Sequence, residues 1–260
     1  MKAIILAAGQ GTRLKKYTEN LPKGMLEFGG KTIIERQIEL YRRCGVADII
    51  VVTGYASDKI TYEGVRYYHN KDFAVTNMVE SMLCARGEFD SDVIVSYSDI
   101  LFSEEMLKAM LDAAGDFAVA VDTNWQAYWQ KRYGRVDFDT ESLTMDGAGC
   151  ITSLGLENPP LAEIDARYVG LLKFSRAGLA KILALWDRDY DEYLEKPWQQ
   201  SGKHIRQAYM TDLLNALIGE GEAVQAVKFT GGWIEFDTNE DYENACRWVE
   251  DGSIKELIEL

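Results

Sequence analysis

Hydrophobic residues follow two alternating patterns along the first 122 residues of the chain. Continuous apolar runs, which are typical of strands buried on both faces of a sheet, occupy 2–8, 47–54, 92–99 and 116–122. Between them, apolar residues recur at helical spacing over 31–43 and 103–114, and a further helix is predicted over 76–86. Shorter strands are predicted at 25–28 and 65–70. This alternation predicts an α/β fold with a mostly parallel sheet.

Residues 123–165 interrupt this order, because they are rich in aromatic, charged and turn-forming residues. The alternation resumes with a strand at 167–175, and the elements after it are a helix, two strands and a last helix, at 210–221, 223–229, 231–237 and from Glu240 onward. No repeat or flexible linker divides the chain. We therefore predict a single domain over 1–260 with an inserted flap at about 123–165.

Composition narrows the classes of function. Lys and Arg number 28 against 42 Asp and Glu, giving a formal charge of −14, and no basic stripe is present, so a nucleic-acid partner is not expected. No apolar run approaches the ~20 residues of a membrane span, so a membrane partner is not expected either. With two histidines and four widely separated cysteines, neither a zinc site nor a disulfide framework is predicted, and a reducing cytoplasm fits best.

The loop after the first strand has the composition of a phosphate-binding turn. Residues 6–14 read LAAGQGTRL and residues 21–23 read LPK. A P-loop would need a G-K-[ST] ending, and a dinucleotide-binding fold would need a third glycine, so neither template fits. Small residues here allow backbone N–H groups to approach phosphates, while Arg13 and Lys23 can make charge-assisted bonds to them. The alternative is a tight strand-to-helix turn with surface cations.

With this loop the chain resembles the sugar-nucleotide type of nucleotidyltransferases, which join a nucleoside monophosphate to a phosphorylated acceptor and release pyrophosphate. The resemblance implies a GT-A-like, Rossmann-like three-layer sandwich whose inserted flap lies on the acceptor side. It also implies catalytic roles for Lys23, Arg13 and Asp99. The nucleotide-binding residues that it implies in the loop, and beside Asp99, are Leu6, Ala7, Ala8, Gly9, Gly11, Thr12, Arg13 and Ser98.

Two acidic residues stand at the ends of predicted strands. Asp99 follows the strand at 92–99, and Asp237 ends the strand at 231–237. Ligands bind at the carboxyl edge of open α/β sheets, and two carboxylates together with phosphates suit Mg²⁺. The resemblance points to the same pair, so we expect Mg²⁺ on Asp99 and Asp237. Glu235 could replace Asp237, and the alternatives are a helix cap for Asp99 and a solvated turn for Asp237.

The segments at 72–85, 97–102 and 168–175 resemble the phosphocholine and phosphonate cytidylyltransferase branch. That branch uses CTP, and its Thr-Asn pair implies nucleotide-binding roles for Thr76 and Asn77. Thr76 could instead serve as the N-cap of the following helix. Phosphocholine, aminoethylphosphonate, another phosphonate and a phosphorylated amino acid all remain open as acceptors.

The flap is expected to contact the acceptor. Trp125, Tyr128, Trp129 and Tyr133 fall at helical spacing, so one face of a helix would carry four aromatic rings. We predict acceptor contacts from Trp125, Trp129 and Lys173, the last because a lysine pointing inward from a sheet needs an anion. The alternative for the aromatic residues is core packing, and the charged pair 131–132 is expected on a solvated face.

Other classes of function remain open beside a CTP-dependent enzyme. A sugar-1-phosphate uridylyl- or thymidylyltransferase would use the same loop, and so would a nucleotide-binding module without catalysis, although such a module has little need for both Asp99 and Asp237. A dinucleotide-dependent oxidoreductase lacks its third glycine. The sequence leaves the oligomeric state open, a homo-oligomer included.

Overall fold

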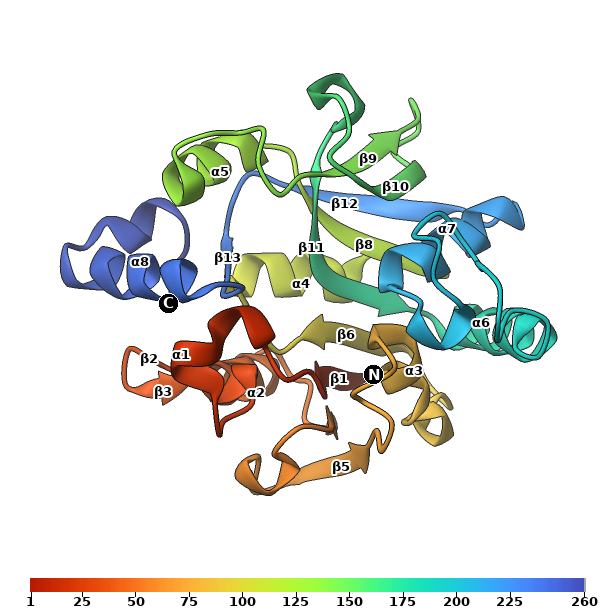
Figure 1. Cartoon of the computed structure of the whole chain (residues 1–260), viewed down its shortest axis with the longest axis horizontal. Coiled ribbons are helices and arrows are strands. Elements are labelled where there is room, and N and C mark those ends of the chain that lie inside the picture. The colour runs from red at the N-terminus through yellow and green to blue at the C-terminus, as the bar shows by residue number, and fades with distance from the viewer. Residues whose placement is uncertain (260) are drawn as a thin grey trace.

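A seven-stranded sheet forms the centre of the molecule in the computed structural model, which describes residues 1–259 (Figure 1). Its strand order is β12-β8-β11-β6-β1-β4-β5. All neighbouring strands pair in parallel except β11, which is antiparallel to both β6 and β8. The strands are β1 (Lys2–Ala7), β4 (Ile49–Thr53), β5 (Val65–His69), β6 (Val93–Tyr97), β8 (Phe117–Asp122), β11 (Arg167–Phe174) and β12 (Val224–Phe229). The predicted α/β class with a mostly parallel sheet is confirmed.

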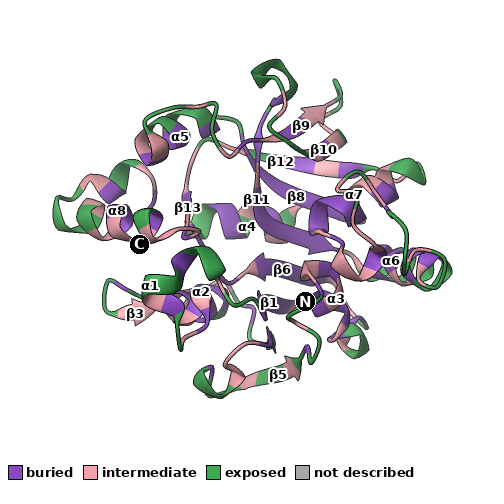
Figure 2. Cartoon of the chain, in the orientation of Figure 1, coloured by how far each residue is buried: buried purple, intermediate pink, exposed green. Residues whose placement is uncertain are grey.

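Helices cover both faces of this sheet and give three layers. Alternate residues of β1 enter two separate hydrophobic clusters: Ile5 packs with one set of helices and Ile4 with the other. The first set is α2 (Ile33–Arg43), α4 (Glu104–Asp112), α5 (Trp125–Tyr133) and α8 (Asn239–Glu250). The second set is α3 (Met78–Leu83), α6 (Arg176–Asp189) and α7 (Met210–Gly219). Figure 2 shows the inner strands as buried along most of their length, which explains their continuous apolar sequences.

Capping residues set the starts of several helices. The Thr32 hydroxyl accepts from the Glu35 N–H and the Glu35 carboxylate accepts from the Thr32 N–H, so α2 begins at Ile33. Ser103 caps α4 in the same way, by accepting from the Met106 N–H.

Two parts of the chain differ from the predicted elements. Helix α6 lies in a segment for which no element is predicted, although Leu179, Ile182 and Trp186 recur at helical spacing and are buried. The expected strand at 231–237 is shorter, because β13 (Trp233–Glu235) pairs with β7 (Ile100–Phe102) in a small separate sheet.

The segment at 123–165 contains regular structure. It holds α5 and the antiparallel pair β9 (Glu141–Met145) and β10 (Ile151–Glu157). The Asn215 amide of α7 donates to the Leu154 carbonyl at 2.7 Å, which ties β10 to the body of the molecule. In Figure 1, α5 lies above α8, and β9 and β10 lie above β12. Over residues 1–259, no helix combines the length and the apolar character needed to cross a membrane.

Candidate active site

The loop after β1 turns back over the end of its own strand. Gly11 has φ +66°, in the left-handed region, and its carbonyl accepts from the Leu14 N–H and the Thr18 hydroxyl. An added Cβ at Gly11 would lie 3.2 Å from the Lys23 Cβ, so a glycine lets Lys23 pack against the loop. Residues 12–14 form a short 3-10 helix rather than the long helix of a dinucleotide-binding turn.

Lys23 lies between two carboxylates that are far apart in the sequence. Its Nζ is 2.6 Å from Asp99 Oδ2 and also pairs with Asp237 Oδ1. Asp99 lies between β6 and β7, and Asp237 follows β13, so the small β7–β13 sheet brings both acids to the loop. The Arg13 guanidinium reaches Asp237 Oδ2 at 2.8 Å. The structure thus brings together all the predicted catalytic and metal-binding side chains.

Charge balance in this cluster favours the ionised forms. Burial alone would raise the pKa of the Asp237 carboxyl, but the Lys23 and Arg13 cations outweigh burial and lower that pKa below its usual value. Burial opposes the charge of Lys23 too, yet Asp99 and Asp237 together raise the pKa of its ammonium. Both shifts favour the charged forms of Asp237 and Lys23.

Glu235 belongs to a neighbouring ion pair. The Arg132 guanidinium pairs with Glu235 and with both oxygens of Asp241, at 2.6 and 2.7 Å for the latter. Arg132 is only 3% exposed, so its expected place on a solvated face is wrong: the short aromatic helix α5 turns this residue toward α8. Because Glu235 is engaged by Arg132, Asp237 is the better placed of the two acids to meet a ligand beside Lys23.

A cavity of about 560 Å³ opens beside this cluster. Its wall contains Arg13, Lys23, Asp99 and Asp237. The remaining wall comes mainly from the start of β11, the β9–β10 pair and α7: Met78, Tyr97, Asp139, Thr140, Glu141, Glu157, Asn158, Arg167, Tyr168, Val169, Tyr209, Thr211 and Glu235. Its size suits a small polar ligand beside the ion cluster.

The other predicted nucleotide-binding residues surround the cluster in different ways. Leu6, Ala7 and Ala8 are buried at the end of β1, whereas Gly9 and Thr12 are exposed on the loop. Ser98 is buried, and its N–H donates to the Leu6 carbonyl at 3.1 Å. These residues fix the loop against β6.

Thr76 and Asn77 both make hydrogen bonds within the protein. Thr76 is not the N-cap of α3; that position is Asn77, which makes no side-chain cap bond. The Thr76 hydroxyl accepts from the Asn70 amide and donates to the Asp72 carbonyl, and the Asn77 amide donates to the Gln207 carbonyl at 2.7 Å. Neither residue lines the cavity, whereas the adjacent Met78 does.

The three predicted acceptor-binding residues lie outside the cavity, and that expectation is corrected. Trp125 and Trp129 are 2% and 0% exposed and pack in the core, where the Trp129 Nε1–H donates to the Phe138 carbonyl. Lys173 lies near the far end of β11, and its Nζ donates to the Leu111 and Ala113 carbonyls at 2.7 and 2.6 Å. Those carbonyls end α4, so a helix C-terminus, and not an anionic ligand, satisfies this lysine.

The residues of the cavity that the sequence did not single out lie on β9, β10, β11 and α7. Arg167 is the most informative of them, since it opens the strand predicted at 167–175. Because β11 runs antiparallel to β6, its first residue lies at the edge where β6 ends. A prediction of this strand direction would have placed Arg167 near Asp99.

A divalent cation fits the pair of acids only with help from a ligand. The described residues contain no group of three or more His, Cys, Asp or Glu side chains that could hold a metal ion. Asp99 and Asp237 nevertheless both direct oxygens at one cationic atom, the Lys23 Nζ. Mg²⁺ prefers oxygen donors and commonly takes one or two carboxylates plus substrate phosphates, so these two residues fit it in a nucleotide-bound state.

This chain is similar to known nucleotidyltransferases over most of its length. Residues 3–200 match the family described as the MobA-like NTP transferase domain. A CTP:phosphoglutamine cytidylyltransferase from Campylobacter jejuni is 35% identical over 254 residues, covering 94% of this chain and 98% of the relative. A choline-phosphate cytidylyltransferase from Streptococcus pneumoniae is 31% identical over 211 residues, covering 75% and 89%.

A solved structure of a nucleotidyltransferase has the same fold as this chain. The CTP:phosphocholine cytidylyltransferase of Streptococcus pneumoniae superposes with a TM-score of 0.74 at 23% identity, over 95% of this chain and 98% of that one. The expected GT-A-like nucleotidyltransferase fold is thereby confirmed.

Proposed function

The chain belongs to the MobA-like NTP transferase family, and from that premise we propose that it transfers CMP from CTP to the phosphate or phosphonate group of a small acceptor. The observation that carries the proposal is the cluster of Lys23, Asp99 and Asp237 at the glycine loop. A module that only bound nucleotide would have little need for two acids beside the phosphate-binding cation.

The reaction needs positioning and neutralisation of charge more than proton transfer. An oxygen of the acceptor's phosphate or phosphonate attacks the α-phosphorus of CTP, and the bond to the β-phosphate oxygen breaks, releasing pyrophosphate. Lys23 and Arg13 place positive charge at the loop, where the phosphates would lie. Histidine is not required for this chemistry, which agrees with a chain that has only two.

Mg²⁺ would be held by Asp99 and Asp237. When bound, it would neutralise charge on the phosphate oxygens. In the structure the Lys23 ammonium holds the position between the two carboxylates. Nucleotide binding would therefore draw Lys23 away from at least one carboxylate and toward the phosphates.

Cytosine is the preferred base on the strength of the two relatives, both of which are cytidylyltransferases. The sugar-1-phosphate uridylyl- and thymidylyltransferase alternative is less favoured for the same reason. Thr76 and Asn77 stay candidates for nucleotide contacts through their place beside Met78, at the wall of the cavity.

Release of pyrophosphate tests the proposal directly. The purified protein with Mg²⁺ should release pyrophosphate from CTP in the presence of a phosphorylated or phosphonate acceptor, and much less from UTP, dTTP, ATP or GTP. Asp99→Asn provides the inactive control. Equal or better use of UTP or dTTP would reject the cytidylyl assignment.

A further inference from the structure

Arg167 is a buried cation without a partner at the wall of the cavity. Its side chain makes no hydrogen bond or ion pair with any residue of 1–259, its residue is 9% exposed, and its Nη1 is buried and unpaired. Burying a guanidinium without an anion is costly, so such groups in proteins are normally paired. The cost is offset if an anionic ligand completes the site.

The protein fixes the position of Arg167 from two sides. Its backbone begins β11, opposite Asp122 at the end of β8, at the edge of the sheet where β6 ends. Its guanidinium lies over the Trp129 indole, 4.5 Å from the ring centre. The indole contact uses none of the guanidinium N–H donors, and a guanidinium can bind a carboxylate through two of them. Trp129 thus positions Arg167 from the core.

A carboxylate with no hydrogen bond from the described residues lies in the same wall. Glu141 begins β9 and lines the cavity. Burial raises the pKa of its carboxyl, and the nearby Arg167 charge opposes that rise. The two residues are close enough to interact through space, yet they form no ion pair within 4 Å among the described residues. The cavity therefore presents separated positive and negative groups beyond the phosphate-binding cluster.

We propose that Arg167 and Glu141 determine which acceptor is used, and that this acceptor is a phosphorylated amino acid. Its carboxylate would pair with Arg167 and its ammonium with Glu141, while the phosphate faces Lys23. The inference rests on the proposed cytidylyl transfer and narrows its substrate class. A choline or amine acceptor without a carboxylate would leave Arg167 buried and unpaired, and a site that loses a polar partner rejects such analogues strongly.

Matched acceptors provide the test. Wild-type protein with CTP is assayed with O-phosphoserine and with amide-phosphorylated glutamine, each beside its counterpart that lacks the carboxylate; for phosphoserine this is phosphoethanolamine. At least one phosphorylated amino acid should exceed its counterpart by roughly 100-fold or more in kcat/KM. Arg167→Met should lower kcat/KM for that amino acid by about 30-fold or more, mainly through KM. The same variant should leave the counterpart, and KM for CTP, within about threefold.

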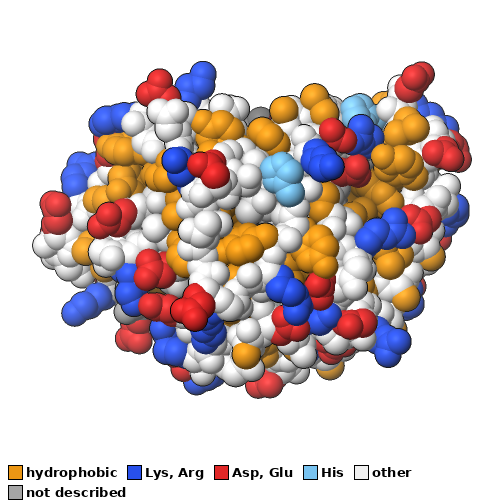
Figure 3. All heavy atoms as spheres, turned by 90° about the horizontal axis from the view of Figure 1, so that it is seen from below, with side chains coloured by type: hydrophobic (Ala, Val, Ile, Leu, Met, Phe, Trp, Pro, Cys, Tyr) orange, Lys and Arg blue, Asp and Glu red, His pale blue; other side chains and the backbone are white. Residues whose placement is uncertain are grey.

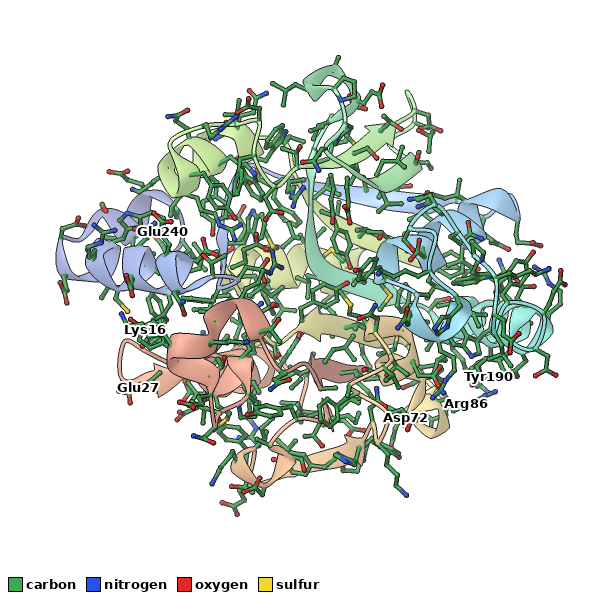
Figure 4. The ribbon with its side chains drawn as sticks, in the orientation of Figure 1. Lys16, Glu27, Asp72, Arg86, Tyr190 and Glu240 are labelled. Atoms are coloured by element: carbon green, nitrogen blue, oxygen red, sulfur yellow. The ribbon has the colours of Figure 1, made fainter. Side chains whose placement is uncertain are left out.

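Three further variants complete the test. Arg86→Met removes an exposed arginine that pairs with Asp187 of α6 and does not line the cavity, so it should match the wild type (Figure 4). Arg167→Lys keeps the positive charge but cannot bind a carboxylate in the bidentate way. It replaces Arg167→Met in the test if that variant does not fold. Glu141→Gln should weaken use of the amino acid more than use of its hydroxy-acid analogue, such as 3-phosphoglycerate for phosphoserine.

The outcomes for the acceptor and for the reaction are distinguishable. Equal use of acceptors with and without a carboxylate, or an equal loss for both in Arg167→Met, overturns the inference and leaves cytidylyl transfer intact. If the protein releases no pyrophosphate from CTP with any of the acceptors, the proposed function fails instead. Calorimetric titration with the phosphorylated amino acids then decides the inference without turnover: weaker binding in Arg167→Met supports it, and no binding or an unchanged Kd overturns it.

Discussion

Lys23 shows how one side chain can serve two states of the site. Without ligand, its ammonium satisfies Asp99 and Asp237; with nucleotide, the same charge would face the phosphates. The ammonium between them offsets the repulsion between two half-buried acidic side chains that lie close together.

Lys23→Met is expected to lower kcat by about 10²-fold or more, because it removes a charge that neutralises the transferring phosphate. KM for CTP should change less than kcat. Steady-state kinetics on the folded variant measure both. Lys16→Met is the matched control, since Lys16 lies on the short helix α1 (Lys15–Thr18) and pairs with Glu243 (Figure 4). Wild-type kinetics in Lys23→Met would contradict the assigned role.

Asp99→Asn should abolish turnover while the protein stays folded, since Asp237 still pairs with Lys23 in the variant. The rate loss expected for a residue that helps to hold a neutralising metal ion is on the order of 10²–10³-fold or more. EDTA should have the same effect on the wild type. Activity that persists in both experiments would make the two acids structural.

Glu141→Gln should stabilise the protein at neutral pH. Burial raises the pKa of this carboxyl, so the folded state binds its proton more tightly than the unfolded state does. The contribution of Glu141 to stability is then greatest below its unfolded pKa of about 4.3 and is lost as pH rises through the folded value. Urea unfolding at several pH values should show the variant's advantage shrinking on acidification. An advantage independent of pH would contradict this account.

At the scale of elements, the direction of a strand and the packing of a helix decide which of their side chains can meet a ligand. Strand β11 carries Arg167 at one end and Lys173 near the other. Arg167 therefore lines the cavity, whereas Lys173 contacts the end of α4. The aromatic rings of α5 face the core, in a hydrophobic cluster that they share with residues of the central sheet and of α8. The four rings pack in the core, which was the alternative to the predicted acceptor contacts of Trp125 and Trp129.

Lys173→Met should destabilise the fold and spare catalysis. It leaves the Leu111 and Ala113 carbonyls at the end of α4 without their donor, at a cost of about 1–3 kcal/mol in the free energy of unfolding. KM for the acceptor should stay at its wild-type value. Lys181→Met, on the exposed side of α6, is the control. A raised acceptor KM in a folded Lys173→Met protein would restore its place in the site.

The whole molecule is acidic, but its charges are mixed. Figure 3 shows basic and acidic side chains interspersed on one face, with hydrophobic patches, drawn in orange, between them. With a formal charge of −14, the long-range field repels a nucleotide, while the local cations Arg13 and Lys23 at the loop would attract it. A cytoplasmic location stays a prediction.

Salt should accordingly speed nucleotide association modestly. Exposed charges are screened beyond about 10 Å at 0.1 M salt, while partly buried ones are screened much less, so added salt weakens the repulsion more than the local attraction. Stopped-flow binding of a fluorescent CTP analogue between low and physiological salt measures the rate. A steep fall in rate with salt would show that a basic field steers the nucleotide.

Sequence patterns determined the features whose causes are local. Continuous apolar runs identified the parallel strands, and glycines with nearby cations identified the loop. Asp99 follows a parallel strand of the central sheet, and residues at the carboxyl ends of such strands gather at one edge. Asp237 instead reaches this edge through β13, which pairs antiparallel with β7 in a separate small sheet. Helix α6 shows the same kind of signal in its apolar spacing, although it was not assigned.

Tertiary structure decided what depends on direction and burial between distant segments. The antiparallel course of β11 brings Arg167 to the cavity and carries Lys173 away from it, and no local pattern in residues 167–174 encodes that direction. Trp129 is equally suited by its sequence to a core or to a binding site, because an indole ring packs well in both; only the meeting of α5 with the sheet and α8 places it beneath Arg167. Strand direction and helix packing are set by contacts across the whole chain, and those contacts chose which cations of this protein face a ligand.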